Sequence, residues 1–436
     1  MSERKEAMTR RDFVRATSSG LAAGTLAFSG FHPAVAAVKA NGKINVAHIG
    51  IGGRGRGLLG DMVKRSKADN ADVSVVAVCD VYAKRRREAE ETSGAKGFEN
   101  FNDVLGLEEV DAVVIATPDH NHAPVAIEAI KKGKDVYVEK PMTHTIQEAE
   151  DLKKVVHEHQ AVLQVGSQTT SNDNWWRAHQ AIEDGMIGKM IMSQGSYHRN
   201  YKTGAWNYDI DEGAGPDASG DNHINWDLWL GPAPTRPYSG ERFFRFRKYW
   251  EYSGGIATDL FYHVMAPLNI AWDKPQIPSR VTGTGGIYIH NDGREVPDTF
   301  FLTADYPEGH SVVLSSTMAN DFHIRGTIRG HEATIVITES GKFEDDDNVT
   351  KVLAQDLFKE KFVEKYGGPE VILENQPRES HMDNFLRCVR TREKPVLDVD
   401  TGLCAQVAIS LSVLSYRSGK TMYFDESTGQ PRDRRP

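Results

Sequence analysis

The chain has 436 residues, of which 39% are hydrophobic and 26% charged, as in a soluble globular protein of two or three domains. Its formal net charge of −9 argues against a nucleic-acid partner, because phosphate binding requires a concentrated basic surface. The three cysteines suggest neither a disulfide framework nor a metal-binding spacing, and we expect them to be buried.

Residues 1–36 predict an export signal. Arg10 and Arg11 precede a hydrophobic residue, an Ala/Gly/Ser-rich run follows from Ala16 to Phe28, and Ala34–Ala36 forms a small-x-small cleavage site. This segment looks like a twin-arginine signal, which exports proteins that have already folded. The alternatives are a general secretory signal or chance arginines beside an Ala-rich linker. We therefore expect a periplasmic or otherwise extracytoplasmic protein, and no later stretch of about 18 apolar residues predicts a membrane span.

Residues 42–170 alternate short apolar strands with amphipathic helices, which is typical of a parallel sheet covered on both faces. The strands are predicted at Ile44–Ile49, Val73–Cys79, Val110–Ala116, Asp135–Val138 and Val162–Val165. The helices are predicted at Leu58–Arg65, Ala83–Thr92, Ala123–Lys132 and Ile146–His159, with a glycine-rich turn at Gly50–Gly57 and a plain connection through Phe101. The predicted fold class is α/β, beginning with a doubly wound Rossmann domain.

Residues 171–436 have a different texture and predict an α+β domain with a large, mostly antiparallel open sheet. The strands are predicted at Ile191–Tyr197, Arg280–Ile289, Asp298–Tyr306, Ser311–Met318, His323–Arg329 and Ala333–Thr338. The helices are predicted at Trp175–Asp184, Ser380–Thr391 and Thr401–Ser418. Asn200–Tyr252 reads as a long irregular segment, and such segments are commonly a site wall or an oligomer contact.

A dinucleotide site is predicted at the start of the mature chain. The fingerprint Gly50-Ile51-Gly52-Gly53-Arg54-Gly55 lies between a strand and a helix, so its backbone can approach a pyrophosphate at the helix N-terminus. Asp80 ends the next strand, where a carboxylate can take the adenosine ribose hydroxyls; this favours NAD over NADP. An acid that merely caps the strand is the alternative. The basic run Lys84–Arg87 reads as a solvated helix face, or as a group beside the adenosine end.

The stretch after the third strand predicts further cofactor contacts. Thr117, Pro118, His120 and His122 follow that strand at the carboxyl edge, where open α/β sheets bind ligands. The two histidines suggest either contact with the ribose or nicotinamide, or loop packing. No carboxylate–histidine cluster completes a metal site nearby, so we expect no metal.

Two downstream motifs predict the chemical site. Glu139-Lys140-Pro141 ends a strand, and a lysine before proline is held extended, so that its ammonium projects over the edge where the nicotinamide lies. Gly254–His263 places Asp259 and His263 four residues apart, on one face of a helix. The carboxylate can then orient the imidazole for proton transfer. A surface pair is the alternative.

In these motifs, and in their order, the chain resembles the Gfo/Idh/MocA oxidoreductases over nearly all of residues 42 to about 424. The resemblance implies that Lys140, Asp259 and His263 are catalytic. His263 would take the hydroxyl proton during hydride transfer, Lys140 would steady the alkoxide, and Asp259 would support both. Glu139 and Lys140 would also contact the cofactor. The resemblance further implies a homo-oligomer, a dimer or tetramer, formed through the open sheet.

Export constrains the reaction, because an extracytoplasmic compartment should hold no useful pool of free NAD. We therefore expect a tightly retained cofactor whose hydride returns within the same site. One class is an oxidoreductase that oxidises one sugar and reduces another. The alternative is a redox-neutral glycoside hydrolase or lyase, which resembles the exported NAD-dependent α-N-acetylgalactosaminidases, although their characteristic catalytic stretch is missing here. A catalytically silent sugar-binding protein is a third class, disfavoured by Lys140 and His263.

Substrate contacts are predicted on the second domain. His198, Tyr201 and Trp206 are candidate carbohydrate-binding residues, with Tyr197 as a further proton-transfer candidate and aromatic packing as the alternative. The indoles between Trp206 and Trp250 would suit the C–H faces of a sugar, or else an oligomer or domain contact. The acidic run Glu344–Asp347 lacks the ordered spacing of a calcium site and reads as a solvated loop.

Overall fold

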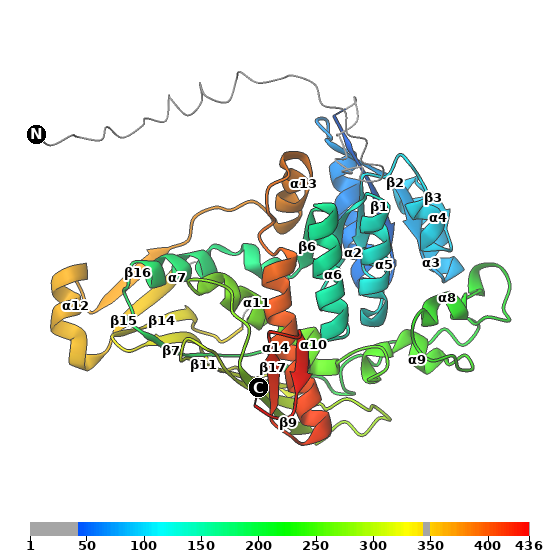
Figure 1. The fold of residues 1–436 in the computed structure, drawn as a ribbon. Coiled ribbons are helices and arrows are strands. Elements are labelled where there is room, and N and C mark those ends of the chain that lie inside the picture. The colour runs from blue at the N-terminus through cyan, green and yellow to red at the C-terminus, as the bar shows by residue number, and fades with distance from the viewer. Residues whose placement is uncertain (1–41, 343–348, 436) are drawn as a thin grey trace, which may run out of the picture. The chain divides into compact units, whose positions relative to one another are not determined.

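The computed structural model describes residues 42–342 and 349–435 (Figure 1). The predicted export signal with Arg10 and Arg11, and the acidic run Glu344–Asp347, lie outside the described residues.

Six parallel strands form the first sheet, in the order β3-β2-β1-β4-β5-β6. They are β1 Ile44–Ile49, β2 Val73–Cys79, β3 Lys96–Phe98, β4 Ala112–Ile115, β5 Asp135–Glu139 and β6 Leu163–Gly166. The connecting helices are α2 Gly53–Ser66, α3 Ala83–Ser93, α4 Phe101–Leu105, α5 His122–Lys131 and α6 Ile146–His159. Strands β1, β4 and β5 are buried along their whole length, because helices cover both faces. The predicted doubly wound fold is confirmed.

Three local predictions in this part were wrong. Helix α2 begins at Gly53, inside the predicted turn, because its glycines accept helical geometry, and Gly55 among them packs against the backbone of Gly50. Strand β3 and helix α4 were read as a plain connection, since three and five residues are too short to show a hydrophobic period.

Ten strands form the second sheet, in the order β16-β15-β14-β13-β7-β11-β10-β9-β17-β18. They are β7 Met190–Ser196, β9 Arg280–Gly286, β10 Thr299–Asp305, β11 Ser311–Thr317, β13 Gly326–Gly330, β14 Ala333–Thr338, β15 Val349–Ala354, β16 Glu370–Glu374, β17 Met422–Asp425 and β18 Gln430–Arg432. All neighbours pair antiparallel except β7 and β11, which are parallel. The predicted mostly antiparallel sheet is confirmed. The short pair β8 Arg199–Asn200 and β12 Ala319–Asn320 lies outside it.

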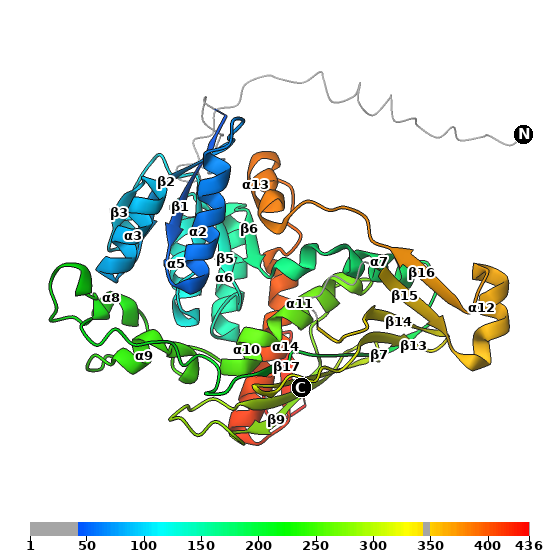
Figure 2. The same ribbon diagram turned by 180° about the vertical axis from the view of Figure 1, so that it is seen from behind.

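Helices cover one face of this sheet, and the other face carries exposed side chains such as Phe301 and Val313. The described helices of this part are α7 Asp173–Glu183, α8 Trp226–Leu230, α9 Gly240–Phe244, α10 Gly255–Leu260, α11 Tyr262–Ala271, α12 Lys359–Tyr366, α13 His381–Thr391 and α14 Val399–Ser418. Figures 1 and 2 show α11 and α14 between the two sheets. Helix α13, although late in the chain, packs on the six-stranded sheet through Phe385 and Val389.

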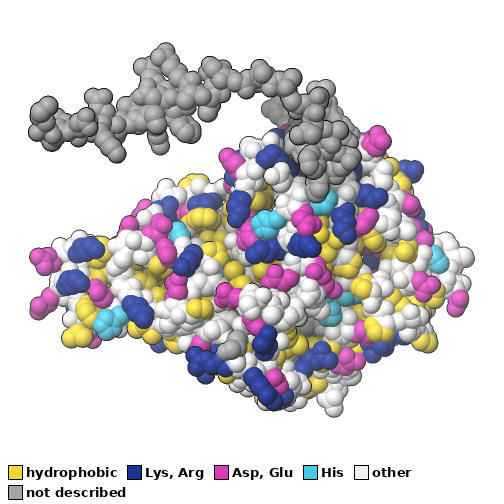
Figure 3. Space-filling model, viewed as in Figure 1, with side chains coloured by type: hydrophobic (Ala, Val, Ile, Leu, Met, Phe, Trp, Pro, Cys, Tyr) yellow, Lys and Arg dark blue, Asp and Glu magenta, His cyan; other side chains and the backbone are white. Residues whose placement is uncertain are grey.

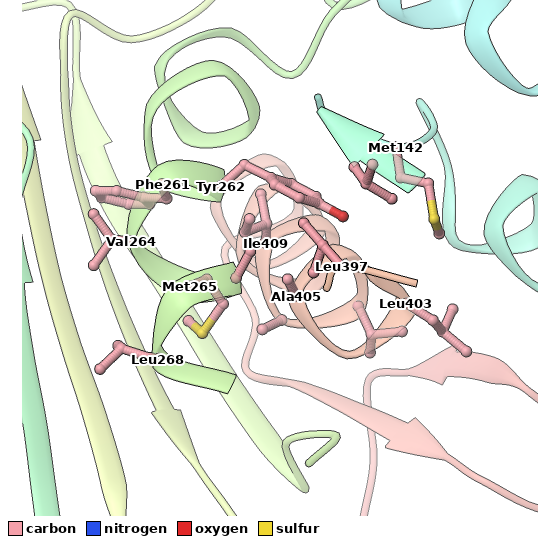
Figure 4. Close-up of a cluster of buried hydrophobic side chains, with 14 of the residues drawn as sticks. Met142, Phe261, Tyr262, Val264, Met265, Leu268, Leu397, Leu403, Ala405 and Ile409 are labelled. Atoms are coloured by element: carbon pink, nitrogen blue, oxygen red, sulfur yellow. The ribbon is translucent and has the colours of Figure 1, made fainter. Parts of the chain in front are cut away.

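The core around α14 joins the two sheets (Figure 4). Met265 of α11 faces Ala405 and Ile409 of α14, and the Tyr262 hydroxyl donates to Gly402 O at 2.9 Å. A Cβ at Gly402 would lie 3.1 Å from Met142 Sδ, just after the Glu139-Lys140-Pro141 motif. This close packing fixes the distance between the lysine motif and the start of α11, and therefore the geometry of the site.

By length and composition, α14 is the one helix in the described ranges that would be able to span a membrane, but 78% of its apolar window is buried inside the protein. On the face shown in Figure 3, Lys and Arg side chains are interspersed with Asp and Glu. Mixed charge of this kind differs from the concentrated basic surface that nucleic acids require.

Candidate active site

The loop between β1 and α2 requires glycine at two positions. Gly50 has a φ of +87°, and a Cβ there would lie 2.7 Å from backbone atoms of Ala116. A Cβ at Gly55 would lie 1.9 Å from Gly50 O. The loop therefore packs directly on the chain after β4. Gly52 and Gly53, which a Cβ would not crowd, leave the N-terminus of α2 open to an anion.

Asp80 fixes this loop from the end of β2. Its carboxylate accepts hydrogen bonds from Ile51 N at 2.7 Å and from Tyr82 N at 2.8 Å. Asp80 also lines the adjacent cavity, on the side where a ribose was expected. The residue thus holds the loop and borders the candidate cofactor site.

A cavity of about 790 Å³ lies along the carboxyl edge of the six-stranded sheet. This volume is within the range of about 300–1,000 Å³ typical of ligand and cofactor sites. The first wall comes from the loops of that sheet and includes Gly50, Gly52, Gly53, Arg54, Asp80, Thr117 and Pro118. The second wall comes from much later in the chain and includes Tyr208, Asp227, Trp229, Phe243, Phe244, Phe246 and Arg247.

The first wall fits a dinucleotide. Thr117 Oγ1 is buried and has no hydrogen-bond partner among the described residues. Gly52 and Gly53 present open backbone at the start of a 14-residue helix. Ile51 and Gly55, which were also predicted to bind the cofactor, are buried beneath the loop and support it. An orphaned hydroxyl beside an open helix N-terminus is the environment that pyrophosphate and ribose oxygens satisfy.

Residues 207–252, here called the covering segment, build the second wall. The prediction of an irregular stretch missed the short helices α8 and α9 within it. The covering segment is bound to the six-stranded domain by the Tyr82–Ile224 bridge and by Asn225 N, which donates to Val81 O at 3.0 Å. Figures 1 and 2 show α8 beside α3. Its own small core surrounds Tyr82.

Arg85 joins the two walls. Its guanidinium lies 5.5, 5.2 and 5.6 Å from the ring centres of Tyr82, Phe243 and Phe244, and it lines the cavity. Other members of the basic run pair with acids on the surface, such as Arg87 with Asp221. The run is therefore divided between a solvated helix face and a position beside the cofactor cavity.

The two histidines after β4 do not line the cavity. His120 Nε2 lies 3.1 Å from Trp229 O, and burial lowers the pKa of His120 to about 3, so the ring is neutral. His122 bonds to Pro141 O at 2.7 Å and Thr117 O at 2.8 Å. We expected both histidines to contact the cofactor directly. In the structure, both rings instead bond to backbone carbonyl groups of the segments around the cavity.

Lys140 reaches across to the second domain. Its Nζ donates to Asp259 O at 2.7 Å and to Asp259 Oδ1 at 2.9 Å. Glu139 faces the glycine loop instead, where its carboxylate accepts from Arg54 Nε at 2.7 Å. The peptide bond between Lys140 and Pro141 is cis. In this motif, Glu139 therefore faces the glycine loop and Lys140 faces the second domain.

Asp259 and His263 do not share one helix as predicted. Helix α10 ends at Leu260 and α11 starts at Tyr262, with Phe261 between them. Burial alone would raise the pKa of Asp259, but Lys140 and Arg247 outweigh it and hold this pKa well below its usual range. Asp259 is therefore an ionised carboxylate that pairs with both Lys140 and Arg247.

The His263 imidazole is buried and neutral, and among the described residues no hydrogen bond joins it to Asp259. Its Nδ1 is buried without a partner among the described residues, and its ring stacks on Tyr197 at 5.6 Å. Burial, reinforced by Lys140, holds the pKa of His263 well below its usual value, so the ring is neutral. The structure brings Lys140, Asp259 and His263 together, as expected, but Asp259 bonds to Lys140 and not to His263.

The three candidate substrate residues lie in different environments. His198 bonds to Ser315 Oγ at 3.1 Å and stacks edge-on to His323, away from His263. Tyr201 is partly exposed and accepts from Arg199 Nη1 at 3.1 Å. Trp206 is buried in the main core. Tyr197, one residue from His198, is the aromatic side chain that faces His263, because successive residues in extended chain point to opposite sides.

The indoles expected to stack on a sugar pack inside the protein. Trp226 and Trp229 stack on each other, with ring centres 4.7 Å apart, in the core of the covering segment. Trp250 packs against Tyr416 and Arg417. The alternative was an oligomer or domain contact, and the structure shows these indoles packed against other residues of the same chain.

Arg247 is a site residue that the sequence did not reveal. Its Nε donates to Asp259 Oδ1 at 3.1 Å, and it lines the cavity. It precedes Asp259 by 12 residues in an irregular stretch, a spacing that carries no periodic signal. Among residues 42–342 and 349–435, no group of three His, Cys, Asp or Glu side chains could hold a metal, and Cys79, Cys388 and Cys404 are buried and free.

Comparison with known proteins agrees with this geometry. Residues 44–167 match the model of the NAD-binding Rossmann fold of the Gfo/Idh/MocA oxidoreductase family, and residues 178–327 match the C-terminal α/β domain of that family. The chain belongs to the Gfo/Idh/MocA oxidoreductase family.

The matched relatives include different activities. An inositol 2-dehydrogenase from Rubrobacter xylanophilus is 34% identical over 130 residues, 29% of this chain and 36% of the relative. A glycosyl hydrolase family 109 protein from Stenotrophomonas maltophilia is 29% identical over 208 residues, 45% of this chain and 43% of the relative. The chain thus spans less than half the length of these curated relatives.

Among solved structures, the aldose-aldose oxidoreductase from Caulobacter crescentus, complexed with glycerol, has a TM-score of 0.64 at 17% identity. The alignment covers 88% of this chain and 100% of that one. The two proteins share the two-sheet fold.

Proposed function

We propose that this protein is an NAD-dependent oxidoreductase of carbohydrate hydroxyl groups, which keeps its cofactor as a prosthetic group. The observation that carries the proposal is the cluster of Lys140, Asp259 and His263, which Arg247 links to a cavity that fits a dinucleotide, because Arg247 lines the cavity and donates to Asp259. When bound, the nicotinamide supplies an acceptor for a hydride from the substrate carbon. The protein must then supply a base for the hydroxyl proton and a charge for the oxygen.

His263 and Lys140 provide these two functions. The neutral imidazole of His263 accepts the hydroxyl proton, since burial keeps its pKa low and its charged form is not populated beforehand. The Lys140 ammonium, held by Asp259, stabilises the oxygen as negative charge develops on it. Tyr197, stacked on His263, limits the rotation of the imidazole.

The second wall of the cavity supports tight retention. Phe243, Phe244 and Trp229 would cover a dinucleotide that the first wall alone would leave open to solvent. The covering segment is anchored to the six-stranded domain by backbone hydrogen bonds and a small core, so release would require these contacts to open. Asp80 beside the cavity supports NAD over NADP, whereas Arg85 adds a positive charge nearby.

Export in folded form, to the periplasm or another extracytoplasmic compartment, completes the proposal. Arg10 and Arg11 support a twin-arginine signal, and a prosthetic cofactor would make the protein independent of a dinucleotide pool outside the cytoplasm. The hydride would then return to a second sugar in the same site. The outer face of the ten-stranded sheet, with exposed Phe301 and Val313, supports a homo-oligomer.

A redox-neutral glycoside hydrolase or lyase is the second candidate. It is favoured by the similarity to the glycosyl hydrolase family 109 protein, which extends over 45% of this chain. In this case, oxidation of a sugar hydroxyl would allow elimination of the glycosidic bond, and addition of water and return of the hydride would follow.

The test is to purify the exported protein without added nucleotide and to identify any dinucleotide that denaturation releases. Incubation with pairs of sugars and with aryl glycosides then distinguishes the two candidates. We expect bound NAD or NADH and conversion of sugar pairs. Glycoside cleavage by the same sample would favour the hydrolase. A protein that arrives empty and steadily reduces added free NAD or NADP would refute retention.

A further inference from the structure

The carboxylate of Asp259 is shared by two cations from different parts of the chain. Lys140 Nζ and Arg247 Nε lie 2.9 and 3.1 Å from the same oxygen, Oδ1. The Lys140 and Asp259 side chains are 12% and 10% exposed, and that of Arg247 is 24% exposed. Ion pairs this well buried are sensitive to the loss of one partner, because the remaining charges are poorly solvated.

Among the described residues, no hydrogen bond joins this carboxylate to the imidazole of His263. The Nδ1 of His263 has no partner among the residues described, whereas Asp259 binds both cations. The position of the Lys140 ammonium is therefore set by Asp259, and the position of that carboxylate is set in turn by Arg247.

Arg247 belongs to the covering segment and is held rigidly there. The next residue, Lys248, is almost fully buried and donates to Glu241 Oε1, Asn207 Oδ1 and Asp292 O at 2.8–3.0 Å. Arg247 also lines the cavity, in the same wall as Phe246. One side chain thus touches both the candidate cofactor cavity and the carboxylate that holds the catalytic lysine.

We propose that Arg247 is a positioning residue, which through Asp259 holds Lys140 in place and so couples the covering segment to the chemical site. The proposal rests on the proposed function for the role of Lys140, and it adds that the second wall contributes to the reaction as well as to cofactor retention. Without Arg247, the Asp259 carboxylate is free to move, and the Lys140 ammonium that it binds is no longer fixed in one position.

A matched control distinguishes this role from a structural one. Arg392 pairs with the buried Asp135, at the start of β5, whereas Lys140 follows the end of the same strand. Arg392→Gln leaves a buried aspartate without its arginine, as Arg247→Gln does, but far from Asp259. A purely structural effect would therefore be similar in the two variants.

The experiment compares Arg247→Gln, Arg247→Lys and Arg392→Gln in the full-length protein. The first readout is the rate at which acetic anhydride acetylates Lys140, measured by mass spectrometry at one pH. In Arg247→Gln we expect about three- to tenfold slower acetylation, because Asp259 then stabilises the unreactive ammonium alone. Loosening of the fold would instead make Lys140 more accessible and its acetylation faster. Arg392→Gln should acetylate at the parent rate.

The second readout is turnover with any sugar that the protein converts. Arg247→Gln should lower kcat about 10- to 100-fold and change KM less than about threefold, and Arg247→Lys should recover most of kcat. Equal acetylation and kcat in Arg247→Gln and Arg392→Gln would overturn the inference. A parent protein that neither holds nor binds dinucleotide would overturn the proposed function instead, while the acetylation rates would still decide the placement of Lys140.

Discussion

The two walls of the cavity differ in how the chain specifies them. The first uses the loops at the carboxyl edge of the six-stranded sheet, where glycine is required at Gly50 and Gly55 because backbone occupies the space of a Cβ. The second uses the 46 residues of the covering segment, whose aromatic side chains have no fixed spacing. The first wall therefore depends on local backbone geometry, and the second on a small core and on hydrogen bonds to the first domain.

This difference separates recognition of the cofactor from its retention. A glycine loop and a helix N-terminus can bind the phosphates of any dinucleotide. A covering segment adds area on the open side and carries Arg247 to the chemical site. Changes in the two walls should consequently affect different measurements.

The largest expected effect is the loss of kcat when Lys140 is replaced. Lys140→Met removes the cation that stabilises the substrate oxygen, and kcat should fall about a thousandfold while bound dinucleotide is retained. Lys134→Met is the matched control, because Lys134 is also buried and donates to Leu107 O and Val110 O at the other end of β5. It should lower the melting temperature and leave kcat nearly unchanged. Equal losses of kcat would argue against a catalytic lysine.

A change in the first wall should abolish recognition. Gly55→Ala places a Cβ 1.9 Å from Gly50 O, so the loop must move and the dinucleotide should bind about a hundredfold more weakly. Gly57→Ala, in the same helix, meets no atom within 4 Å and should stabilise the protein by about 0.5–1 kcal/mol. Isothermal titration with NAD checks the first variant and thermal unfolding the second. Unchanged affinity in Gly55→Ala would show that the loop does not contact the cofactor.

A change in the second wall should affect retention more than recognition. Phe244→Ala removes a half-buried ring from the cavity, and bound dinucleotide should dissociate about tenfold faster. The rate is measured by dilution into excess unlabelled NAD. Phe322→Ala, whose side chain is 86% exposed, is the control. If both variants release the nucleotide at the parent rate, the covering segment does not retain it.

The last expected effect is on the pH dependence of stability, and it comes from two buried histidines outside the cavity lining. His48 on β1 and His120 beneath the covering segment are buried, which lowers the pKa of each to about 3. An unfolded histidine titrates near 6.5, so only the unfolded chain binds these protons between pH 6.5 and 3. Stability should thus be complete above pH 6.5 and fall on acidification by about 1.4 kcal/mol per pH unit for each ring.

Urea unfolding between pH 7.5 and 5 tests this slope. His48→Leu and His120→Gln should each make the dependence shallower by one ring's contribution. His159→Gln, at an exposed position, should leave the slope unchanged. A parent protein whose stability is flat over this range would contradict the neutral state of the buried rings.

The sequence predicted elements best where a period was long and continuous. Strand β2 and helix α6 have the predicted bounds, since an apolar run and an amphipathic helix of 14 residues are unambiguous. Helix α12 and strands β15 and β16 were missed, because Val349–Glu374 is mostly polar and its strands are only half-buried. The break at Phe261 was also missed, since no proline or glycine marks it.

By itself, the sequence determined the glycine loop and the parallel sheet, whereas the meeting of Lys140, Asp259 and His263 was expected from the resemblance to the family. Motifs that follow strands of one parallel sheet must reach the same edge. Only the tertiary structure decided that Asp259 holds Lys140 instead of His263, that Tyr197 rather than His198 faces the imidazole, and that Arg247 joins them. These contacts depend on packing between segments far apart in the chain, for which residue spacing carries no signal.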